Sequence, residues 1–151
     1  MSAYDIIIIG GGPAGLTAAI YARRANKTVL VLEAKACGGQ IINTPDIENY
    51  PVEAHISGYD FGVKLTEQVK ALGAEIVMEK AVDIEVNGEE KTVRTAKNAY
   101  TAKAVIIATG SENRKLGLAN EDALTGRGVS YCATCDGNFF RRKKVAVVGG
   151  G

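Results

Sequence analysis

Two cysteines separated by two small residues form the strongest chemical signal in this 151-residue sequence. Cys132 and Cys135 lie in the segment Cys-Ala-Thr-Cys-Asp-Gly, and Asp136 follows them directly. A helix that starts at Cys135 and runs toward Phe140 would favour the thiolate, because the N-terminus of a helix stabilises negative charge. Since the thiolate is the form that attacks disulfides, and a neighbouring acid can transfer protons, we expect a redox-active dithiol here.

Two other interpretations of the cysteine pair stay open on the residues alone. A zinc site usually needs four ligands, and the other candidates, Cys37 and His55, share no metal-ligand spacing with the pair, so we expect no metal. A pair of buried, non-redox cysteines is the second alternative, and the adjacent Asp136 argues against full burial. We interpret Cys37 as a small loop residue and His55 as a surface residue without a paired nucleophile.

A glycine-rich turn near the start of the chain is the second chemical signal. Gly10, Gly12 and Gly15 follow an apolar run and open a predicted helix. In this pattern the first glycine permits a tight turn, the second lets the backbone approach a pyrophosphate, and the third lets the helix pack closely on the strand. Glu33, at the end of the next predicted strand, fits an acid that hydrogen-bonds an adenosine ribose and disfavours a 2′-phosphate. We therefore expect FAD or NAD here, the alternative being a structural turn beside a surface acid.

The elements that must position these residues alternate between strands and helices. We predict strands at 4–9, 28–32, 75–79 and 104–108, and helices at 13–25 and 59–72, the second ended by Gly73. Residues 81–86 and 91–95 predict a hairpin around an Asn-Gly turn, and residues 33–57 a loop. This order predicts an α/β fold with a doubly wound parallel sheet and an antiparallel β insertion.

The C-terminal segment repeats the pattern of residues 6–12. Residues 145–148 are β-branched or small and precede Gly149-Gly150-Gly151, which predicts a second buried strand that meets a glycine turn. Because a parallel strand needs a crossover helix after it, we expect the chain to be the N-terminal part of a longer protein. The polar stretch 111–128 predicts a linker, and the basic run 141–144 a solvated stretch before the last strand.

The composition excludes several classes of protein. With 18 Lys and Arg against 17 Asp and Glu, the net charge is +1, which gives no electrostatic reason to bind nucleic acid or an anionic membrane. No apolar run reaches the roughly 18 residues of a membrane helix, and no basic segment precedes the first apolar run as in a secretory signal. Three cysteines are too few for a disulfide-rich secreted scaffold, so we expect a cytoplasmic protein.

Together with three further segments, these motifs resemble the low-molecular-weight thioredoxin reductases. The segments are Gly38-Gly39-Gln40, Asp46-Ile47-Glu48-Asn49-Tyr50-Pro51 and Ala108-Thr109-Gly110, and they follow the family's order along nearly the whole chain. The resemblance implies an FAD-binding, Rossmann-like domain over 1–113, with its C-terminal part missing. It also implies the start of an NADPH domain over 114–151, a hinge near 112–118, thioredoxin as the partner and a homodimer.

The resemblance also implies roles for single residues. The implied cofactor-binding residues are Gly10, Gly12, Pro13, Ala14, Gly15, Glu33, Ala34, Lys35, Gly38, Gly39, Gln40, Asn49, Ala81, Ala108, Thr109 and Gly110. The implied catalytic residues are Cys135 as the sulfur nearer the flavin, Cys132 as the sulfur that attacks the thioredoxin disulfide, and Asp136 as the proton donor or acceptor.

Three alternatives to a thioredoxin reductase remain at this point. The flavoprotein subunit of alkyl hydroperoxide reductase uses a similar pair, but it usually carries an extra N-terminal region, whereas the first strand here starts at Tyr4. A ferredoxin- or flavin-dependent relative would lack NADPH binding. A flavin- or nucleotide-binding module without turnover is the third alternative.

Overall fold

The computed structural model describes residues 3–149, apart from the side chains of residues 3, 134 and 135. The chain divides into two compact units, Met1–Gly110 and Ser111–Gly151, and each is described by itself. Among the helices of the described residues, none combines the length and the apolar character that crossing a bilayer requires.

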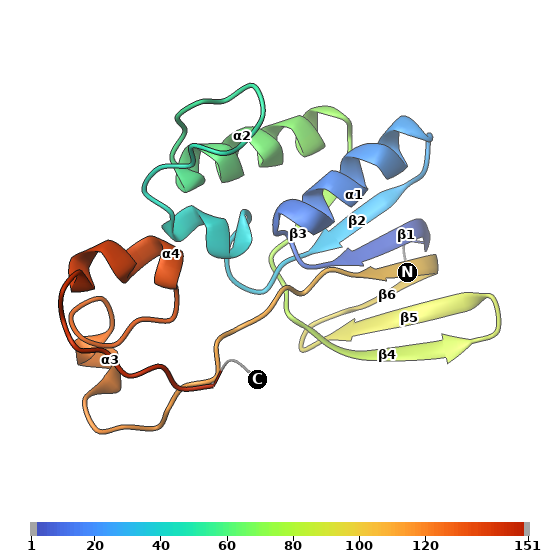
Figure 1. The fold of residues 1–151 in the computed structure, drawn as a ribbon. Coiled ribbons are helices and arrows are strands. Elements are labelled where there is room, and N and C mark those ends of the chain that lie inside the picture. Colours follow the sequence, from blue (N-terminus) through green and yellow to red (C-terminus); the bar gives the residue numbers. More distant parts are fainter. Residues whose placement is uncertain (1–2, 150–151) are drawn as a thin grey trace. The chain divides into compact units, whose positions relative to one another are not determined.

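A six-stranded mixed sheet with strand order β3-β2-β1-β6-β5-β4 is the centre of the first unit (Figure 1). Its strands are β1 (Ala3–Ile9), β2 (Val29–Leu32), β3 (Glu75–Val77), β4 (Ala81–Asn87), β5 (Glu90–Thr95) and β6 (Ala99–Ile107). The strands β3, β2, β1 and β6 run parallel, whereas β5 is antiparallel to both of its neighbours. Ile9 pairs with Leu32 on one side and Ile107 on the other, so three parallel strands end at the same edge of the sheet.

Two helices, α1 (Pro13–Arg24) and α2 (Gly58–Ala71), pack on one face of the parallel strands (Figure 1). Pro13 fits the first turn of α1 because that position needs no N–H donor. Ser57 caps α2 by accepting the Asp60 N–H at 3.0 Å. The core on this face joins α1 and α2 to β1 and β2 through the buried side chains of Ile8, Leu16, Val29, Val31 and Val69.

The antiparallel end of the sheet contributes side chains to the core on the other face of β1 and β2. Val93 of β5 and Ala102 of β6 pack against side chains of β1 and β2 that point away from the helices, namely Ile7, Ile9, Leu30 and Leu32. Because β1 and β2 are covered on both faces, their sequences read as continuous apolar runs rather than as alternating ones. The predicted α/β class with an antiparallel insertion is confirmed.

Some predicted element boundaries differ from the structure. The prediction of a strand at 104–108 misses its first half, because β6 begins at Ala99, where it pairs with β5 before it pairs with β1. The predicted loop 33–57 contains a 3-10 helix, η1 (Gly39–Asn43), and a bridge between Ile47 and Ile56. The predicted strand at 75–79 is shorter, since β3 ends at Val77.

In the described part of the second unit the helices are short: α3 (Glu121–Leu124), α4 (Ala133–Asp136) and a 3-10 helix, η2 (Gly137–Phe140). The linker prediction for 111–128 is therefore wrong at α3, and the predicted helix starts at Ala133 instead of Cys135. The strand predicted at 145–148 is also wrong within the described residues. No described strand pairs with this segment, and its valines are exposed, so the hydrogen bonds that define a strand are missing.

Candidate functional site

The glycine turn after β1 lies at the carboxyl ends of three parallel strands. The Gly10 N–H donates to the Leu32 carbonyl at 2.8 Å, and the Ala108 N–H donates to the Ile9 carbonyl at 2.8 Å. Gly10 has a φ of 109°, a conformation that favours glycine. In open α/β sheets, ligands bind outside the carboxyl ends of the parallel strands, at the point where the strand order reverses.

The three motif glycines differ in what surrounds them. A Cβ built on Gly10 would lie 2.2 Å from the Ala108 carbonyl oxygen, and one built on Gly15 would lie 1.9 Å from the Gly10 carbonyl oxygen. These two glycines are therefore required by the packing of the turn itself. A Cβ on Gly12 would meet only the Gly39 Cα, at the ordinary contact distance of 3.8 Å. Nothing in the described chain requires glycine at position 12. The absence of a side chain at Gly12 therefore leaves room for a ligand group to approach the backbone closely.

The N-terminus of α1 points at the same place. Gly12 is its N-cap residue, no side chain caps the helix, and Pro13 follows as the first helical residue. The N–H groups in the first turn of a helix have no intrahelical partner, and they carry a partial positive charge. An uncapped first turn beside an open glycine matches the donor set that binds a diphosphate. The residues present thus fit the pyrophosphate of a dinucleotide.

Glu33 joins the glycine turn to the end of β2. Its carboxylate accepts the Gly11 N–H at 2.6 Å and the Lys35 N–H at 2.7 Å. The side chain is buried, at 9% exposure. The two bonds hold the acid at the turn, where the sequence predicted an acid for the ribose. The contact with Gly11 was not predicted, because only the third dimension brings the two residues together.

A second glycine-rich loop closes against the first. The Gly38 N–H donates to the Gly11 carbonyl at 2.8 Å, and a Cβ on Gly39 would lie 3.1 Å from the Gly12 Cα. Gly38 also approaches Gly62 of α2, where an added Cβ would meet the Gly38 Cα at 3.2 Å. Gly11 and Gly62 were not predicted from the sequence. The run of three glycines and a glycine inside a predicted helix were the signals that mark such close approaches.

The remaining predicted cofactor residues divide into two groups. Ala14 lies in the first turn of α1, Gln40 lies in η1, and the residues that follow strand ends are Ala34, Lys35, Thr109 and Gly110. Asn49 lies in the exposed, bridged part of the loop before α2, and Ala81 begins β4. No hydrogen bond within the described residues joins Asn49 or Ala81 to the glycine turn. Their assignment stays a prediction.

Cys37 is a half-buried free thiol beside this turn. A Cβ on Gly11 would lie 3.3 Å from its Sγ. Burial of the thiol, and next the charge of Glu33, raise the pKa of Cys37, so the unreactive protonated form is favoured. This environment agrees with the interpretation of Cys37 as a small loop residue.

In the second unit, the backbone N–H and carbonyl of Cys132 both form hydrogen bonds. Its N–H donates to the Ser130 hydroxyl at 3.2 Å, and its carbonyl accepts the Ser130 hydroxyl at 3.2 Å and the Asp136 N–H at 3.0 Å. Asp136 ends α4 and is half-buried. The side chain of Cys135 lies outside the described residues, as do Gly150 and Gly151 of the second glycine turn. The dithiol therefore stays a prediction.

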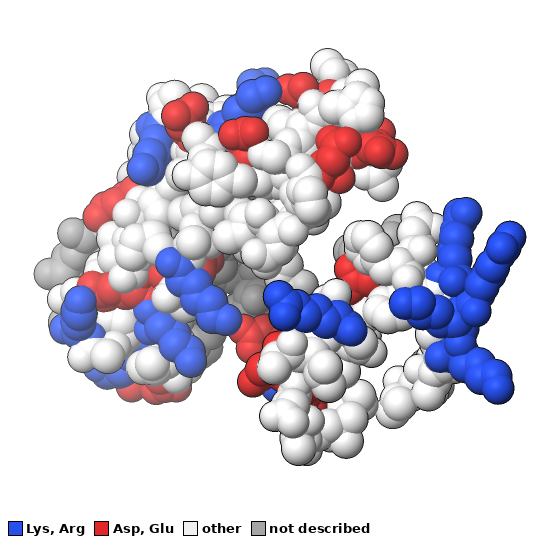
Figure 2. Space-filling model, turned by 90° about the vertical axis from the view of Figure 1, so that its left-hand side faces the viewer, with Lys and Arg blue, Asp and Glu red and all other residues white. Residues whose placement is uncertain are grey.

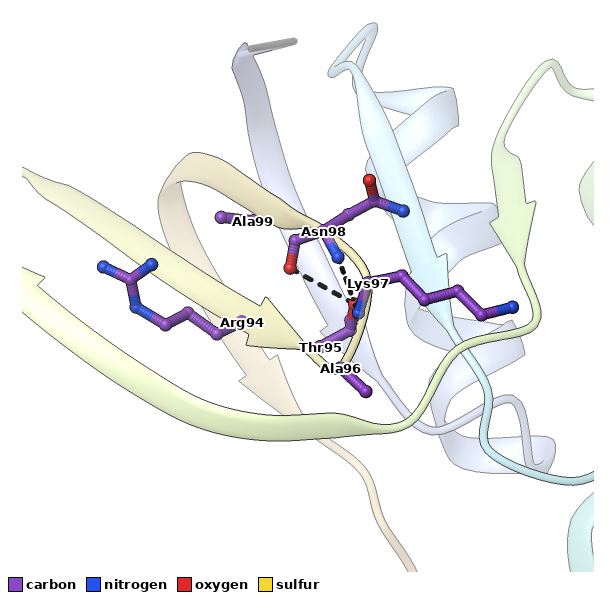
Figure 3. Close-up of a pocket in the computed structure, with 6 residues that line it drawn as sticks. All are labelled: Arg94, Thr95, Ala96, Lys97, Asn98 and Ala99. Atoms are coloured by element: carbon purple, nitrogen blue, oxygen red, sulfur yellow. Dashed lines mark hydrogen bonds between the residues drawn. The ribbon is translucent and has the colours of Figure 1, made fainter.

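Several surface features lie outside this site. His55 is exposed and hydrogen-bonds Asp46 at 2.9 Å, which raises the pKa of His55. A shallow hollow lined by residues 94–99 belongs to the turn between β5 and β6, at the opposite end of β6 from Ala108 (Figure 3). Over most of the face in Figure 2, basic and acidic side chains are interspersed, although some basic side chains stand together. The run 141–144 is exposed, as predicted.

The comparisons with known proteins agree with this geometry. The model of the pyridine nucleotide-disulphide oxidoreductase family matches residues 4–151, so the chain belongs to that family. Its relatives include the thioredoxin reductase of Listeria monocytogenes, which is 49% identical over 148 residues, 98% of this chain and 46% of the relative. The resemblance predicted from the motifs is thereby confirmed. The chain spans about half the length of the curated relatives it matches.

Solved structures give the same result. The thioredoxin reductase of Streptococcus pyogenes has a TM-score of 0.81 and 50% sequence identity, and the match covers 92% of this chain and 45% of that one. A ferredoxin-flavin thioredoxin reductase from Clostridium acetobutylicum has a TM-score of 0.71 and 38% identity, and the match covers 93% of this chain and 48% of that one.

Proposed function

We propose that this chain provides the FAD-binding turn and the redox-active dithiol of a thioredoxin reductase. The observation that carries the proposal is Gly12, whose open side faces Gly39 beside the uncapped N-terminus of α1. FAD, when bound, supplies a carrier that takes up a hydride from NADPH and passes two electrons to a disulfide. The family to which the chain belongs, and the names of its relatives, support this assignment.

The first unit's own residues would bind and orient the cofactor. The first-turn N–H groups of α1 would donate to the diphosphate, and Glu33 would accept from the ribose hydroxyls. Glu33 has two oxygens with several acceptor positions, so it can keep the Gly11 N–H while it binds the ribose. Its negative charge would repel a 2′-phosphate, which favours FAD over NADP at this turn.

The second unit's residues would carry the exchange with thioredoxin. The Cys132 thiolate would attack one sulfur of the thioredoxin disulfide, form a mixed disulfide and release the other sulfur as a thiolate, which takes a proton. The Cys135 thiolate would then attack Cys132, re-form the Cys132–Cys135 disulfide and release the second thioredoxin sulfur, which takes another proton. Asp136 would pass these protons, since it follows Cys135 directly in the sequence and a carboxylate can transfer protons.

Further parts of the proposal concern the whole protein. We assign residues 1–113 to the FAD domain and 114–151 to the start of an NADPH domain, in a cytoplasmic homodimer whose partner is thioredoxin. The match to a ferredoxin-flavin thioredoxin reductase favours a second candidate, in which reduced ferredoxin or a flavin replaces NADPH as the electron donor. Supplying each donor in turn to the native protein, under anaerobic conditions, separates the two candidates.

Replacing Cys135 by serine in the native protein tests the role of the dithiol. We expect the variant to keep its flavin, as measured by its absorbance spectrum, and to lose thioredoxin reduction, because no second sulfur can resolve the mixed disulfide. Cys37→Ser is the matched control and should keep both properties, since the Cys37 thiol is shielded and protonated. Loss of flavin from Cys135→Ser, or full thioredoxin reduction by it, would contradict the assigned role.

A further inference from the structure

The second unit contains a buried acid that the proposed chemistry does not use. The side chain of Glu121 is only 5% exposed, although the unit is small. Its carboxylate accepts three backbone N–H groups: Leu116 at 2.9 Å, Gly117 at 2.7 Å and Leu118 at 3.0 Å. Burial favours the protonated acid, but the three N–H donors together outweigh it and lower the pKa of Glu121. The ionised carboxylate therefore fixes the turn that precedes α3.

A closed loop connects Glu121 to the segment before the cysteines. The Leu124 carbonyl at the end of α3 accepts the N–H groups of Arg127 at 2.8 Å and Val129 at 2.9 Å. The Gly126 N–H donates back to the Val129 carbonyl at 2.9 Å. The Thr125 hydroxyl adds a bond to the Glu121 carbonyl at 3.0 Å. Residues 121–129 thus form one hydrogen-bonded loop with the buried carboxylate at its start.

Ser130 carries this loop on to Cys132. Its hydroxyl accepts the Cys132 N–H and donates to the Cys132 carbonyl, both at 3.2 Å. The same carbonyl accepts the Asp136 N–H at the end of α4. Hydrogen bonds and directly adjacent residues therefore connect the turn at 116–118 to the backbone of Cys132.

We propose that Glu121 is a positioning residue for the Cys132–Cys135 dithiol, acting through the loop 121–129 and Ser130. The inference rests on the proposed function only in taking the two cysteines as a redox pair. Because the segment before Cys132 is held by hydrogen bonds, the reduced pair can reach fewer conformations. This restriction raises the effective concentration of one thiol at the other. The anchored loop therefore favours the disulfide over the dithiol.

The test measures the thiol–disulfide equilibrium of the full chain in glutathione buffers. Two glutathione thiols supply the two electrons and two protons that convert the disulfide to the dithiol, and themselves become glutathione disulfide. Differential alkylation read peptide by peptide follows Cys132 and Cys135 separately from Cys37. We expect Glu121→Gln to shift the equilibrium threefold to tenfold toward the dithiol, where tenfold corresponds to about 30 mV. The amide places an NH2 group against backbone N–H donors, so it cannot replace both carboxylate oxygens.

Two further variants make the result specific. Ser130→Ala removes the last link and should shift the equilibrium in the same direction, whereas Asp122→Asn, which removes the exposed neighbouring acid, should leave it within twofold of the wild type. An unchanged equilibrium in a folded Glu121→Gln chain overturns the proposal. If circular dichroism shows that Glu121→Gln does not fold, Ser130→Ala decides, and an unchanged equilibrium there overturns the proposal too. Because the assay contains no flavin, nucleotide or thioredoxin, its failure is distinct from a failure of the reductase activity.

Discussion

The substitutions Gly12→Ala and Gly15→Ala add the same methyl group at two glycines of one motif and should have opposite consequences. At position 15 the new Cβ would lie 1.9 Å from the Gly10 carbonyl oxygen, so the backbone of the turn must move. Overpacking of this kind costs up to about 3 kcal/mol. The higher helix propensity of alanine offsets about 1 kcal/mol of this destabilisation. We therefore expect Gly15→Ala to lower the free energy of unfolding by about 2 kcal/mol.

At position 12 the added methyl group should hardly change folding. Its nearest neighbour would be the Gly39 Cα at 3.8 Å, and the φ of −76° is one that alanine adopts. Replacing an N-cap glycine by alanine destabilises the fold by about 0.5–1 kcal/mol. The lower conformational entropy of the unfolded alanine variant offsets about 0.4–1 kcal/mol of this loss. The methyl group does, however, fill the space that we assign to the diphosphate. A crowding cost of about 1–3 kcal/mol weakens FAD binding about fivefold to 140-fold.

Two assays separate these effects. Urea denaturation of the 151-residue chain, followed by circular dichroism, gives the free energy of unfolding of each variant. Titration of the flavin-free native protein with FAD, followed by flavin fluorescence, gives the dissociation constant. Wild-type FAD affinity in Gly12→Ala would refute the assignment of Gly12 to the cofactor. A loss of stability in Gly12→Ala equal to that in Gly15→Ala would refute the distinction between the two glycines.

Two further predictions concern stability. Val52, which follows Pro51 in a turn, has a φ of 77°, a conformation that favours glycine. Val52→Gly should therefore raise the free energy of unfolding, measured in urea, by about 1 kcal/mol. The control Val86→Gly, at an exposed position of β4, should lower it. Asp5 accepts hydrogen bonds from the Lys103 ammonium and from Thr28, which hold its pKa below the usual range. A lowered native pKa stabilises the fold above the unfolded pKa of about 3.9, and this contribution is lost as the pH falls below it. Asp5→Asn should thus lower the urea midpoint at pH 7 and have a smaller effect at pH 3, and equal losses at both values would contradict the assignment.

The parts of the fold that depend on local sequence could be predicted well. The apolar runs before Gly10 and Glu33 mark the ends of β1 and β2 because strands buried on both faces carry no polar residues. The Asn87-Gly88 pair marks the hairpin of β4 and β5, although Asn87 is still paired with Glu90 and the turn itself is formed by Gly88 and Glu89. Gly88 adopts the positive φ, 63°, that favours glycine. The spacing of Gly10, Gly12 and Gly15 placed the turn at the strand ends.

Features that depend on distant partners could not be predicted. The first half of β6 is a strand because β5 pairs with it, and its own sequence gives little sign of this. The apolar run 145–148 has the sequence of a strand but no partner in the described residues. The contact of Glu33 with the Gly11 N–H and the three N–H bonds of Glu121 each depend on a turn whose conformation the sequence pattern does not state.

An anaerobic reductive titration of the native protein tests the proposed electron path most directly. The flavin absorbance and the free thiols of Cys132 and Cys135 are measured after each addition of dithionite. Uptake of four electrons per chain, two of which appear as thiols at Cys132 and Cys135, is the predicted result. Uptake of two electrons or none, with both sulfurs still oxidised, would contradict it.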